Sequence, residues 1–240
     1  MSFKLELIAF NIQSCIDAQA AGAQRVELCA NPAEGGTTPS YGFIKAARDK
    51  LTIDLYPIIR PRGGDFVYTD DEFEIMKSEI KVCKVFGCNG IVVGMLHADG
   101  SVDKLRCKEL IDLAKPLGVT FHRAFDRSRD LLQALEDVIE IGCERILTSG
   151  GFPTAVDGSA MIAELIKHAR GRIVIMPGSG VRSGNIKKLA QETGAVEFHS
   201  SARMNLPGKM NFISHQMKED QTHVSIDVEE ATALALALNE

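Results

Sequence analysis

The sequence lacks several features that would place it in a membrane or on a nucleic acid. Its 240 residues contain no apolar run approaching the roughly 20 residues that a helix needs to cross a bilayer. The first residues have no apolar core of a signal peptide, so export is not expected. The net charge of −5 argues against an extended nucleic-acid surface. These absences favour a cytoplasmic protein without membrane or nucleic-acid partners.

The cysteines likewise show no pattern of a metal site. The six cysteines include no CxxC pair, and Cys83 and Cys88 are too isolated to suggest a zinc site. In a chain of this length without an export signal, scattered cysteines are typical of reduced thiols in the cytosol. No GxGxxG motif opens the first helix, which disfavours a dinucleotide-binding open sheet.

The sequence does contain a recurring unit, in which a helical stretch ends at a glycine and a short apolar strand follows. Gly118 before 119–121 is one example, and a glycine just past a helix end adopts the left-handed conformation at little steric cost. Strands are predicted near residues 5–8, 25–28, 53–59, 90–93, 119–121, 145–147, 172–175 and 196–198. Eight such strands with helices between them predict a closed (β/α)₈ TIM barrel in a single domain spanning 1–240, with a doubly wound open sheet as the alternative.

Helical patterns are clearest at 70–86 and 128–141, where apolar residues recur at helical spacing.

The last quarter of the sequence departs from this alternation of helices and strands. The segment 204–226 shows no periodicity, and we expect an irregular loop that acts as an interface or a lid. Asp227 and Glu230 then predict a capping box for a final helix over 227–238.

Polar side chains are concentrated where the predicted strands end, which is the active-site face of a TIM barrel. Guanidinium groups suit planar oxyanions, and glycine-rich turns such as 178–180 expose N–H groups that bind phosphate or carboxylate. The predicted substrate-binding residues are Arg60, Arg62, Arg123, Thr148, Ser149, Gly178, Gly180 and Ser201. The predicted catalytic residues are Glu27, His122, Asp126 and His199, because imidazoles and desolvated carboxylates exchange protons near neutral pH.

Each of these assignments has a structural alternative. His122 can be a hydrogen-bonding residue of the scaffold, and Glu27 with Arg60 can form an ion pair that closes the mouth of the barrel. The turn at 178–180 can be a plain turn. Cys29 can be a small apolar core residue.

Six blocks of the sequence resemble, in order, those of the CutC family: residues 25–29, 34–40, 59–66, 120–126, 145–151 and 197–203. The resemblance implies a TIM barrel, a cytoplasmic location, often a homodimer, and a role in copper binding and copper homeostasis. Copper(I) favours soft thiolate and thioether ligands. Cys29 matches the strand-two cysteine of the family, whereas Ile8 stands where many relatives carry the second cysteine of a proposed copper site. Met176 is then the other candidate ligand.

Two hypotheses remain at this point. The first is a cytoplasmic Cu(I)-binding protein that uses Cys29. The second is an enzyme that acts on a small anionic substrate, with or without a phosphate. In that enzyme Arg60, Arg62 and the turn at 178–180 hold the anion, and His122 with Glu27 transfers protons. The sequence predicts no organic cofactor and leaves the reaction type open.

Overall fold

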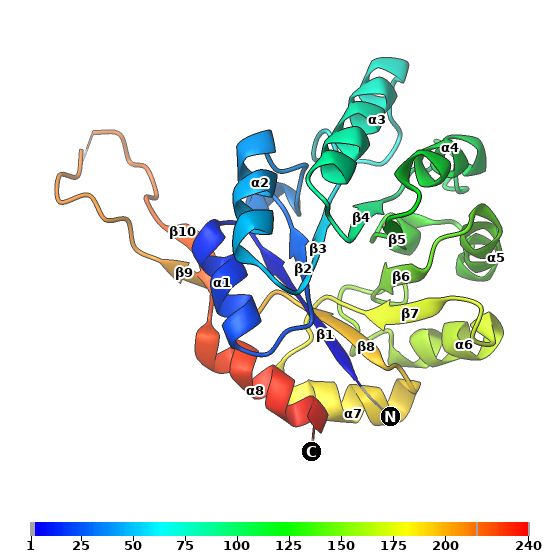
Figure 1. Ribbon diagram of the computed structural model, residues 1–240. Helices are drawn as coiled ribbons and strands as arrows, with labels where there is room; N and C mark the ends of the chain where they lie inside the picture. Colours follow the sequence, from blue (N-terminus) through cyan, green and yellow to red (C-terminus); the bar gives the residue numbers. More distant parts are fainter. Residues whose placement is uncertain (1–2, 215, 240) are drawn as a thin grey trace.

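Eight parallel strands alternate with helices that surround them, as the strand pattern predicts (Figure 1). The structure is a computed structural model, and it describes residues 3–214 and 216–239. The strands are β1 (Lys4–Ala9), β2 (Arg25–Leu28), β3 (Asp54–Pro57), β4 (Gly90–Val93), β5 (Gly118–Phe121), β6 (Arg145–Thr148), β7 (Val174–Pro177) and β8 (Glu197–Ser200). The helices between them are α1 (Ile12–Ala20), α2 (Tyr41–Lys50), α3 (Asp70–Val85), α4 (Lys104–Ala114), α5 (Leu131–Ile141), α6 (Ser159–Ala169) and α7 (Ser183–Thr193). Two short 3₁₀ turns, η1 (Pro32–Glu34) and η2 (Phe125–Arg127), follow β2 and β5.

The strands form two four-stranded sheets with the orders β3-β2-β1-β8 and β4-β5-β6-β7. Two backbone hydrogen bonds join β3 to β4: Ile59 N donates to Val92 O at 2.8 Å, and Asn89 N donates to Leu55 O at 3.1 Å. On the other side β7 lies beside β8, so the two sheets together form a TIM barrel.

The register of β1 with its neighbours decides which side chains meet inside the barrel. Glu6 lies opposite His199 of β8, and Ile8 lies opposite Glu27 of β2. Residues two apart on a strand point to the same side. Glu6 and Ile8 therefore both face the barrel interior, and Glu27 and His199 join them from the two adjacent strands.

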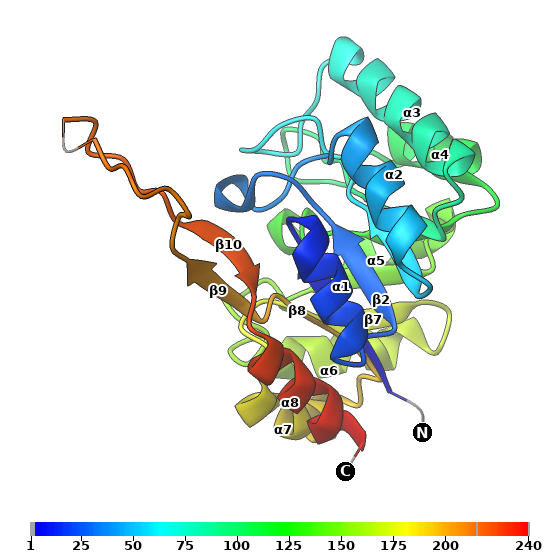
Figure 2. The same ribbon diagram turned by 60° about the vertical axis from the view of Figure 1, so that its left-hand side comes forward.

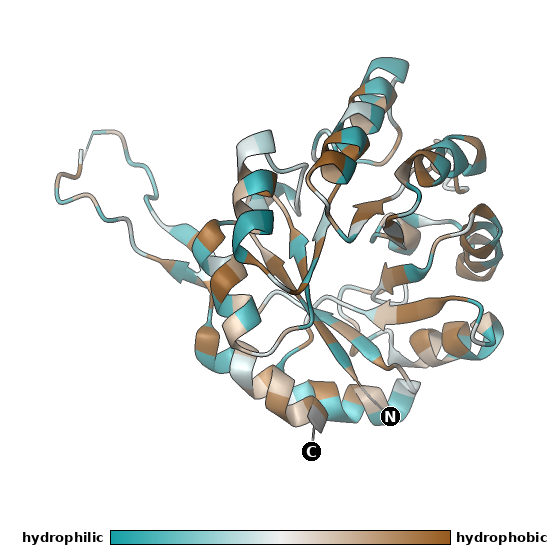
Figure 3. Ribbon diagram, viewed as in Figure 1, coloured by the Kyte–Doolittle hydropathy of each residue, from teal (hydrophilic) through white to brown (hydrophobic). Residues whose placement is uncertain are grey.

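Capping side chains determine where the two predicted helices begin. Thr69 and Glu72 form a complete capping box, so α3 begins at Asp70 as expected. Asp130 accepts hydrogen bonds from two N–H groups of the first turn of α5, which therefore begins at Leu131 rather than at 128. Figure 3 shows that these helices carry apolar stripes, and their buried apolar residues pack on the strands to form the main core.

After β8 the chain leaves the barrel as a projecting arm (Figures 1 and 2). β9 (Arg203–Leu206) and β10 (His223–Ile226) pair as an antiparallel ribbon, so the prediction of an irregular loop over 204–226 is wrong at both ends. Between the strands, residues 207–214 and 216–222 form no helix or strand. The exposed apolar side chains of the arm are Met204, Met210, Phe212, Ile213 and Met217.

The final helix α8 (Val228–Asn239) returns to the barrel and lies beside α7. Asp227 Oδ1 accepts hydrogen bonds from the N–H groups of Glu229 and Glu230 at 3.1 Å, so it caps the helix as predicted. The carboxylate of Glu230 does not complete the capping box, because it accepts instead from Ser183 N and Oγ, both at 2.8 Å. In the described ranges, no helix combines the length and the apolar character needed to cross a membrane.

Candidate active site

A cavity of about 220 Å³ opens at the carboxyl ends of the barrel strands. A wider cavity of about 730 Å³ adjoins it and shares Arg60, Phe66 and Arg123 in its wall. The predicted site residues that line the inner cavity are Glu27, Arg60, His122, Arg123, Gly180, His199 and Ser201. The structure thus brings together most of the side chains expected at this face.

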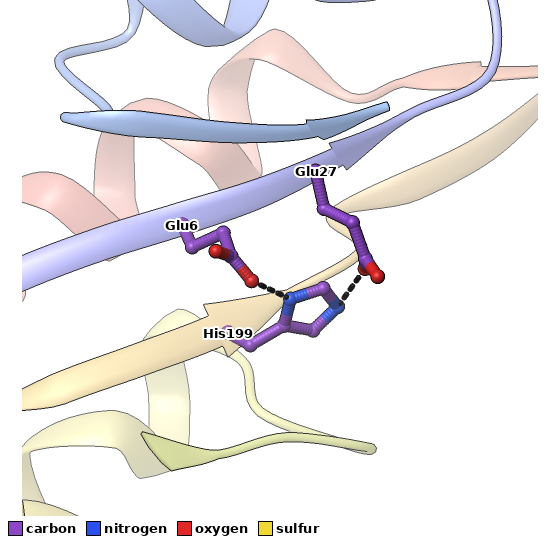
Figure 4. Close-up of side chains that lie close together, drawn as sticks. All are labelled: Glu6, Glu27 and His199. Atoms are coloured by element: carbon purple, nitrogen blue, oxygen red, sulfur yellow. Dashed lines mark hydrogen bonds and ion pairs between the residues drawn. The ribbon is translucent and has the colours of Figure 1, made fainter. Parts of the chain in front are cut away.

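A buried row of three ionisable side chains, Glu6, His199 and Glu27, reaches this cavity through His199 and Glu27 (Figure 4). His199 Nδ1 lies 2.7 Å from Glu6 Oε1, and His199 Nε2 lies 3.7 Å from Glu27 Oε2. All three side chains are buried. The imidazole therefore lies between two carboxylates, one in the barrel interior and one at the cavity.

Burial and charge set the protonation of this row. Burial would raise the pKa of Glu6, but Arg25 and His199 outweigh it and lower that pKa to about 2. Burial is the main reason that the pKa of Glu27 rises to about 7. Burial favours the neutral ring of His199, but the hydrogen bond to Glu6 and the charge of Glu27 raise its pKa. Glu6 is therefore ionised at neutral pH, His199 tends to hold a proton, and Glu27 can exchange one.

A chain of buried ion pairs holds Glu6 in place from below. Arg25 Nε donates to Glu6 Oε2 at 2.5 Å, and Arg25 Nη2 donates to Glu197 Oε2 at 2.7 Å. Arg145 Nε donates to the same Glu197 oxygen at 2.6 Å. Sequence reasoning missed this network and Glu6 with it. The available signal was a charged residue at the first position of a short buried strand, as Arg25, Arg145 and Glu197 each are.

Arg60 carries a buried positive charge in the wall of the same cavity. Its Nη1 donates to the carbonyl oxygens of Glu34 and Gly36, and its Nη2 donates to that of Gly64, at 2.7–2.9 Å. The expected alternative, an ion pair with Glu27, is not formed, and among the described residues no carboxylate is in ion-pair contact with Arg60. Carbonyl dipoles leave the charge of the guanidinium uncompensated, so the cavity favours an anion.

His122 is held as a neutral ring. Ala124 N donates to His122 Nδ1 at 3.2 Å, and the ring packs against Phe66 with centroids 5.0 Å apart. Burial, reinforced by the charge of Arg60, lowers the pKa of His122 to about 3. A ring that stays neutral does not suit the proton-transfer role we expected for it at neutral pH.

Asp126 is part of a clamp rather than a free catalytic acid. Its Oδ1 accepts from Thr148 Oγ1 at 2.5 Å and from the N–H groups of Ser149 and Gly151 at 3.0 Å. Its Oδ2 accepts from Arg123 Nε at 2.7 Å and from Ser149 Oγ at 3.1 Å. The structure brings these predicted residues together, but they bind one another and tie the loop after β5 to the loop after β6.

Two other predicted binding residues do not reach the cavity. Arg62 points outward, where it pairs with Glu72 at 2.6 Å and with Asp65 at 3.0 Å and keeps 40% of its side chain exposed. Gly178 is needed for packing, since a Cβ there would lie 2.4 Å from Leu147 Cδ1. Its role is steric and does not involve a ligand.

The first turn of α7, where we expected a phosphate, is bonded by a side chain of the protein itself. The Glu230 carboxylate accepts from Ser183 N and Oγ. An anion at this position is favoured by the helix dipole and by the free N–H groups of the first turn. Because Glu230 already supplies that anion, α7 offers no obvious phosphate site.

The row of Glu6, Glu27 and His199 has the spacing of a metal site, with one ligand atom from each residue within 4.8 Å of the others. However, His199 Nδ1 is already bonded to Glu6, and Glu6 also accepts from Arg25. A cation next to this arginine would be repelled. The row is therefore poorly suited to hold a metal ion.

Cys29 does not have the surroundings of a Cu(I) ligand. Its thiol is buried in an apolar cluster against which Ile8 packs, and burial raises its pKa well above the usual range. Met176 Sδ lies in the barrel interior and accepts from Arg25 Nη2 at 3.4 Å. In the part of the chain that the structure describes, no cluster of three or more metal-ligating Cys, His, Asp or Glu side chains includes Cys29. The residues present do not fit a Cu(I) site.

Comparison with known proteins agrees with the fold. The model of the CutC family matches residues 3–204. The chain belongs to the CutC family. A family protein CutC from Parabacteroides distasonis is 52% identical over 226 residues, which cover 94% of this chain and 93% of the relative. A human copper homeostasis protein cutC homolog is 44% identical over 210 residues, covering 88% of this chain and 77% of the relative.

A solved CutC structure shares the architecture. The crystal structure of the putative copper homeostasis protein CutC from Streptococcus agalactiae superposes with a TM-score of 0.80 at 34% identity, covering 83% of this chain and 98% of that one. The matched CutC residues end at 204, close to the start of β9. The barrel and its cavity therefore lie within the family match, whereas most of the arm and α8 lie beyond it.

Proposed function

We propose that this CutC-family protein binds a small organic anion in its cavity and that Glu27 and His199 transfer a proton on the bound molecule. One observation carries the proposal: Glu27 and His199, two members of the buried Glu6–His199–Glu27 row, line a cavity whose wall also carries the Arg60 guanidinium. A general acid or base works best when its pKa is close to the working pH. Burial brings the pKa of Glu27 to about 7, which meets that condition.

The anion is a carboxylate rather than a phosphate. Many TIM barrels bind phosphate at the loops after the last two strands with the help of a helix N-terminus. Here the first turn of α7 is bonded by Glu230, and the chain passes from β8 directly to the strand β9. Arg60 and Arg203 line the cavity instead, and guanidinium groups match the planar geometry of a carboxylate.

Calorimetric titration with a panel of small mono- and dicarboxylates, and with inorganic phosphate, tests this proposal. We expect at least one carboxylate to bind, and Arg60→Leu to weaken that binding at least about tenfold, or about 1.4 kcal/mol. The matched control is Arg129→Leu, since Arg129 is exposed and pairs with Asp99 away from the inner cavity. Equal binding to the wild type and to Arg60→Leu would refute the assignment.

Copper homeostasis with Cu(I) binding is the second candidate function. It is supported by the names of the relatives and not by the residues of the cavity. A single buried thiol is a weak Cu(I) site, because Cu(I) prefers two or more soft ligands. A competition titration of the reduced protein against a Cu(I) chelator, with Cys29→Ser alongside, tests it. Tight binding of one Cu(I) that is lost in Cys29→Ser would establish copper as the ligand despite Ile8.

We also propose that the protein is a cytoplasmic homodimer whose chain forms one domain. The exposed apolar side chains of the arm, among them Phe212 and Ile213, support an interface at this segment. Sedimentation analysis of the wild type and of a Phe212→Ser, Ile213→Ser variant tests the dimer. A single unfolding transition would support one domain, and cell fractionation tests the cytoplasmic location.

A further inference from the structure

Two buried N–H groups in the cavity wall have no acceptor. His122 Nε2 and Arg60 Nε have no hydrogen-bond partner of good geometry within the described ranges, although both residues are at most 5% exposed and the unpaired Tyr68 hydroxyl lies near Arg60. Both line the inner cavity and both contact Phe66: the His122 ring centroid and Arg60 Cζ each lie 5.0 Å from the Phe66 ring centroid. Buried donors are nearly always paired in folded proteins. Both donors are covered in this structure, so a ligand supplies the acceptor only if a covering side chain such as Phe66 moves aside.

The hydrogen bonds of His122 define what it can offer. Because Ala124 N donates to Nδ1, that nitrogen holds no proton, and the proton of the neutral ring is on Nε2. The nearby guanidinium of Arg60 opposes a second proton on the ring. His122 is thus a fixed hydrogen-bond donor, in the same sense as a backbone N–H group that stabilises an oxyanion.

We propose that the substrate is a small carbonyl compound bearing a carboxylate, and that His122 Nε2–H and Arg60 Nε–H stabilise its carbonyl oxygen while a proton leaves the adjacent carbon. This inference rests on the proposed function, which supplies Glu27 as the base. The C–H bond next to the carbonyl breaks, and its electron pair forms a C=C bond. The π electrons of the C=O bond move to the oxygen, which becomes an enolate held by the two donors, and the proton passes to the Glu27 carboxylate. Return of a proton to carbon completes the cycle without an oxidant, a reductant or another reactant.

The arrangement of charges suits this sequence of events. Negative charge develops on an oxygen next to one cation and one neutral donor, on the wall that carries Arg60 and His122. The proton moves to Glu27, next to His199, which lies between Glu27 and the ionised Glu6. A neutral donor can stabilise an enolate without protonating it, and this separates the role of His122 from that of Glu27.

Oxalate, a planar dianion shaped like an enediolate, is the probe for this inference. Calorimetry compares the wild type with His122→Phe, which removes the donor, and with His122→Gln, which restores an N–H donor. His168→Gln is the control on an exposed helix position. We expect oxalate to bind the wild type, to bind His122→Phe at least tenfold more weakly, and to recover part of that loss in His122→Gln. Nitrogen NMR of the unmodified protein is the second readout, with His122 as the Nε2–H tautomer from pH 5.5 to 8 and with oxalate shifting its Nε2 signal.

The outcomes separate the two proposals. If oxalate binding weakens in Arg60→Leu but not in His122→Phe, the anion site stands and the carbonyl inference fails. It also fails if NMR shows His122 with a proton on Nδ1, or if oxalate leaves its Nε2 signal unchanged. If oxalate and every carboxylate of the panel fail to bind the wild type, both proposals fall. Because the NMR readout uses the wild type, poor folding of a variant cannot decide the result.

Discussion

Replacing Glu27 by glutamine should stabilise the protein, and the gain should grow with pH. Glu27 is buried, and folding raises the pKa of its carboxyl group from 4.5 to about 7. A raised folded-state pKa means that stability is greatest below the unfolded value and falls as the pH rises through about 7. The difference corresponds to a penalty of about 3 kcal/mol at pH 8 and less than about 1 kcal/mol at pH 5. Glutamine does not ionise and therefore removes this penalty.

Urea unfolding of the wild type and of Glu27→Gln at pH 5, 6, 7 and 8 measures the effect as a change in midpoint at constant slope. Glu219→Gln, on the exposed arm, is the control for a charge change without burial. A buried carboxyl group that destabilises the fold when charged is consistent with the proposed role of Glu27 in proton transfer. A difference between wild type and variant that does not vary from pH 5 to pH 8, or a variant less stable at pH 8, would refute the reasoning.

Three further substitutions test the scaffold below the cavity. Arg25→Leu leaves two buried carboxylates without their shared cation, and we expect the free energy of unfolding in urea to fall by about 3–5 kcal/mol; a loss below about 1 kcal/mol would contradict the network. Gly90→Ala places a Cβ 2.1 Å from the Tyr56 ring, so thermal unfolding should show a loss of about 1–3 kcal/mol, and an unchanged Tm would count against this contact. Glu230→Gln weakens the charged cap of α7, and chemical unfolding should show a loss of about 1 kcal/mol that shrinks at high salt.

The barrel was predictable because its signals are local. A glycine after each helix and a short apolar strand after each glycine locate most of the β/α units without any knowledge of the tertiary structure. The ribbon of β9 and β10 was missed for the opposite reason. Each strand does alternate polar and apolar residues, over 203–206 and 223–226, but each is only four residues long. The whole length of the arm separates them, so nothing local in the sequence indicates that they pair.

The sequence correctly predicted the positions of those candidate site residues that follow from the carboxyl ends of the strands. Glu27, His122 and His199 lie at or near the carboxyl ends of their strands, and those ends converge in any TIM barrel. The direction of a side chain in a loop is not determined in this way. Arg60 and Arg62 are two residues apart, yet the first lines the cavity and the second pairs with carboxylates outside it. Glu6 escaped notice because its role depends on the register that pairs it with β8.

The same register yields a prediction about copper. Ile8 lies opposite Glu27, lines the cavity and packs against the cluster that contains Cys29. Ile8→Cys would therefore place a second thiol in contact with that cluster, and two thiolates form the soft donor set that Cu(I) favours. We expect Ile8→Cys to bind Cu(I) on the order of a hundredfold more tightly than the wild type, a gain of about 2.7 kcal/mol, in a competition titration under reducing conditions.

Two variants decide whether the gain arises from the pair of thiols. Ile8→Ser makes the same strand position polar without adding sulfur, and it should bind Cu(I) no better than the wild type. The double variant Ile8→Cys, Cys29→Ser should lose the gain, because one thiol again stands alone. If Ile8→Cys binds no more tightly than Ile8→Ser, the cluster around Cys29 cannot form a copper site even with both thiols present. If instead the wild type already matches Ile8→Cys, copper binding in this chain does not depend on the strand-one cysteine, and the ligands must be sought elsewhere.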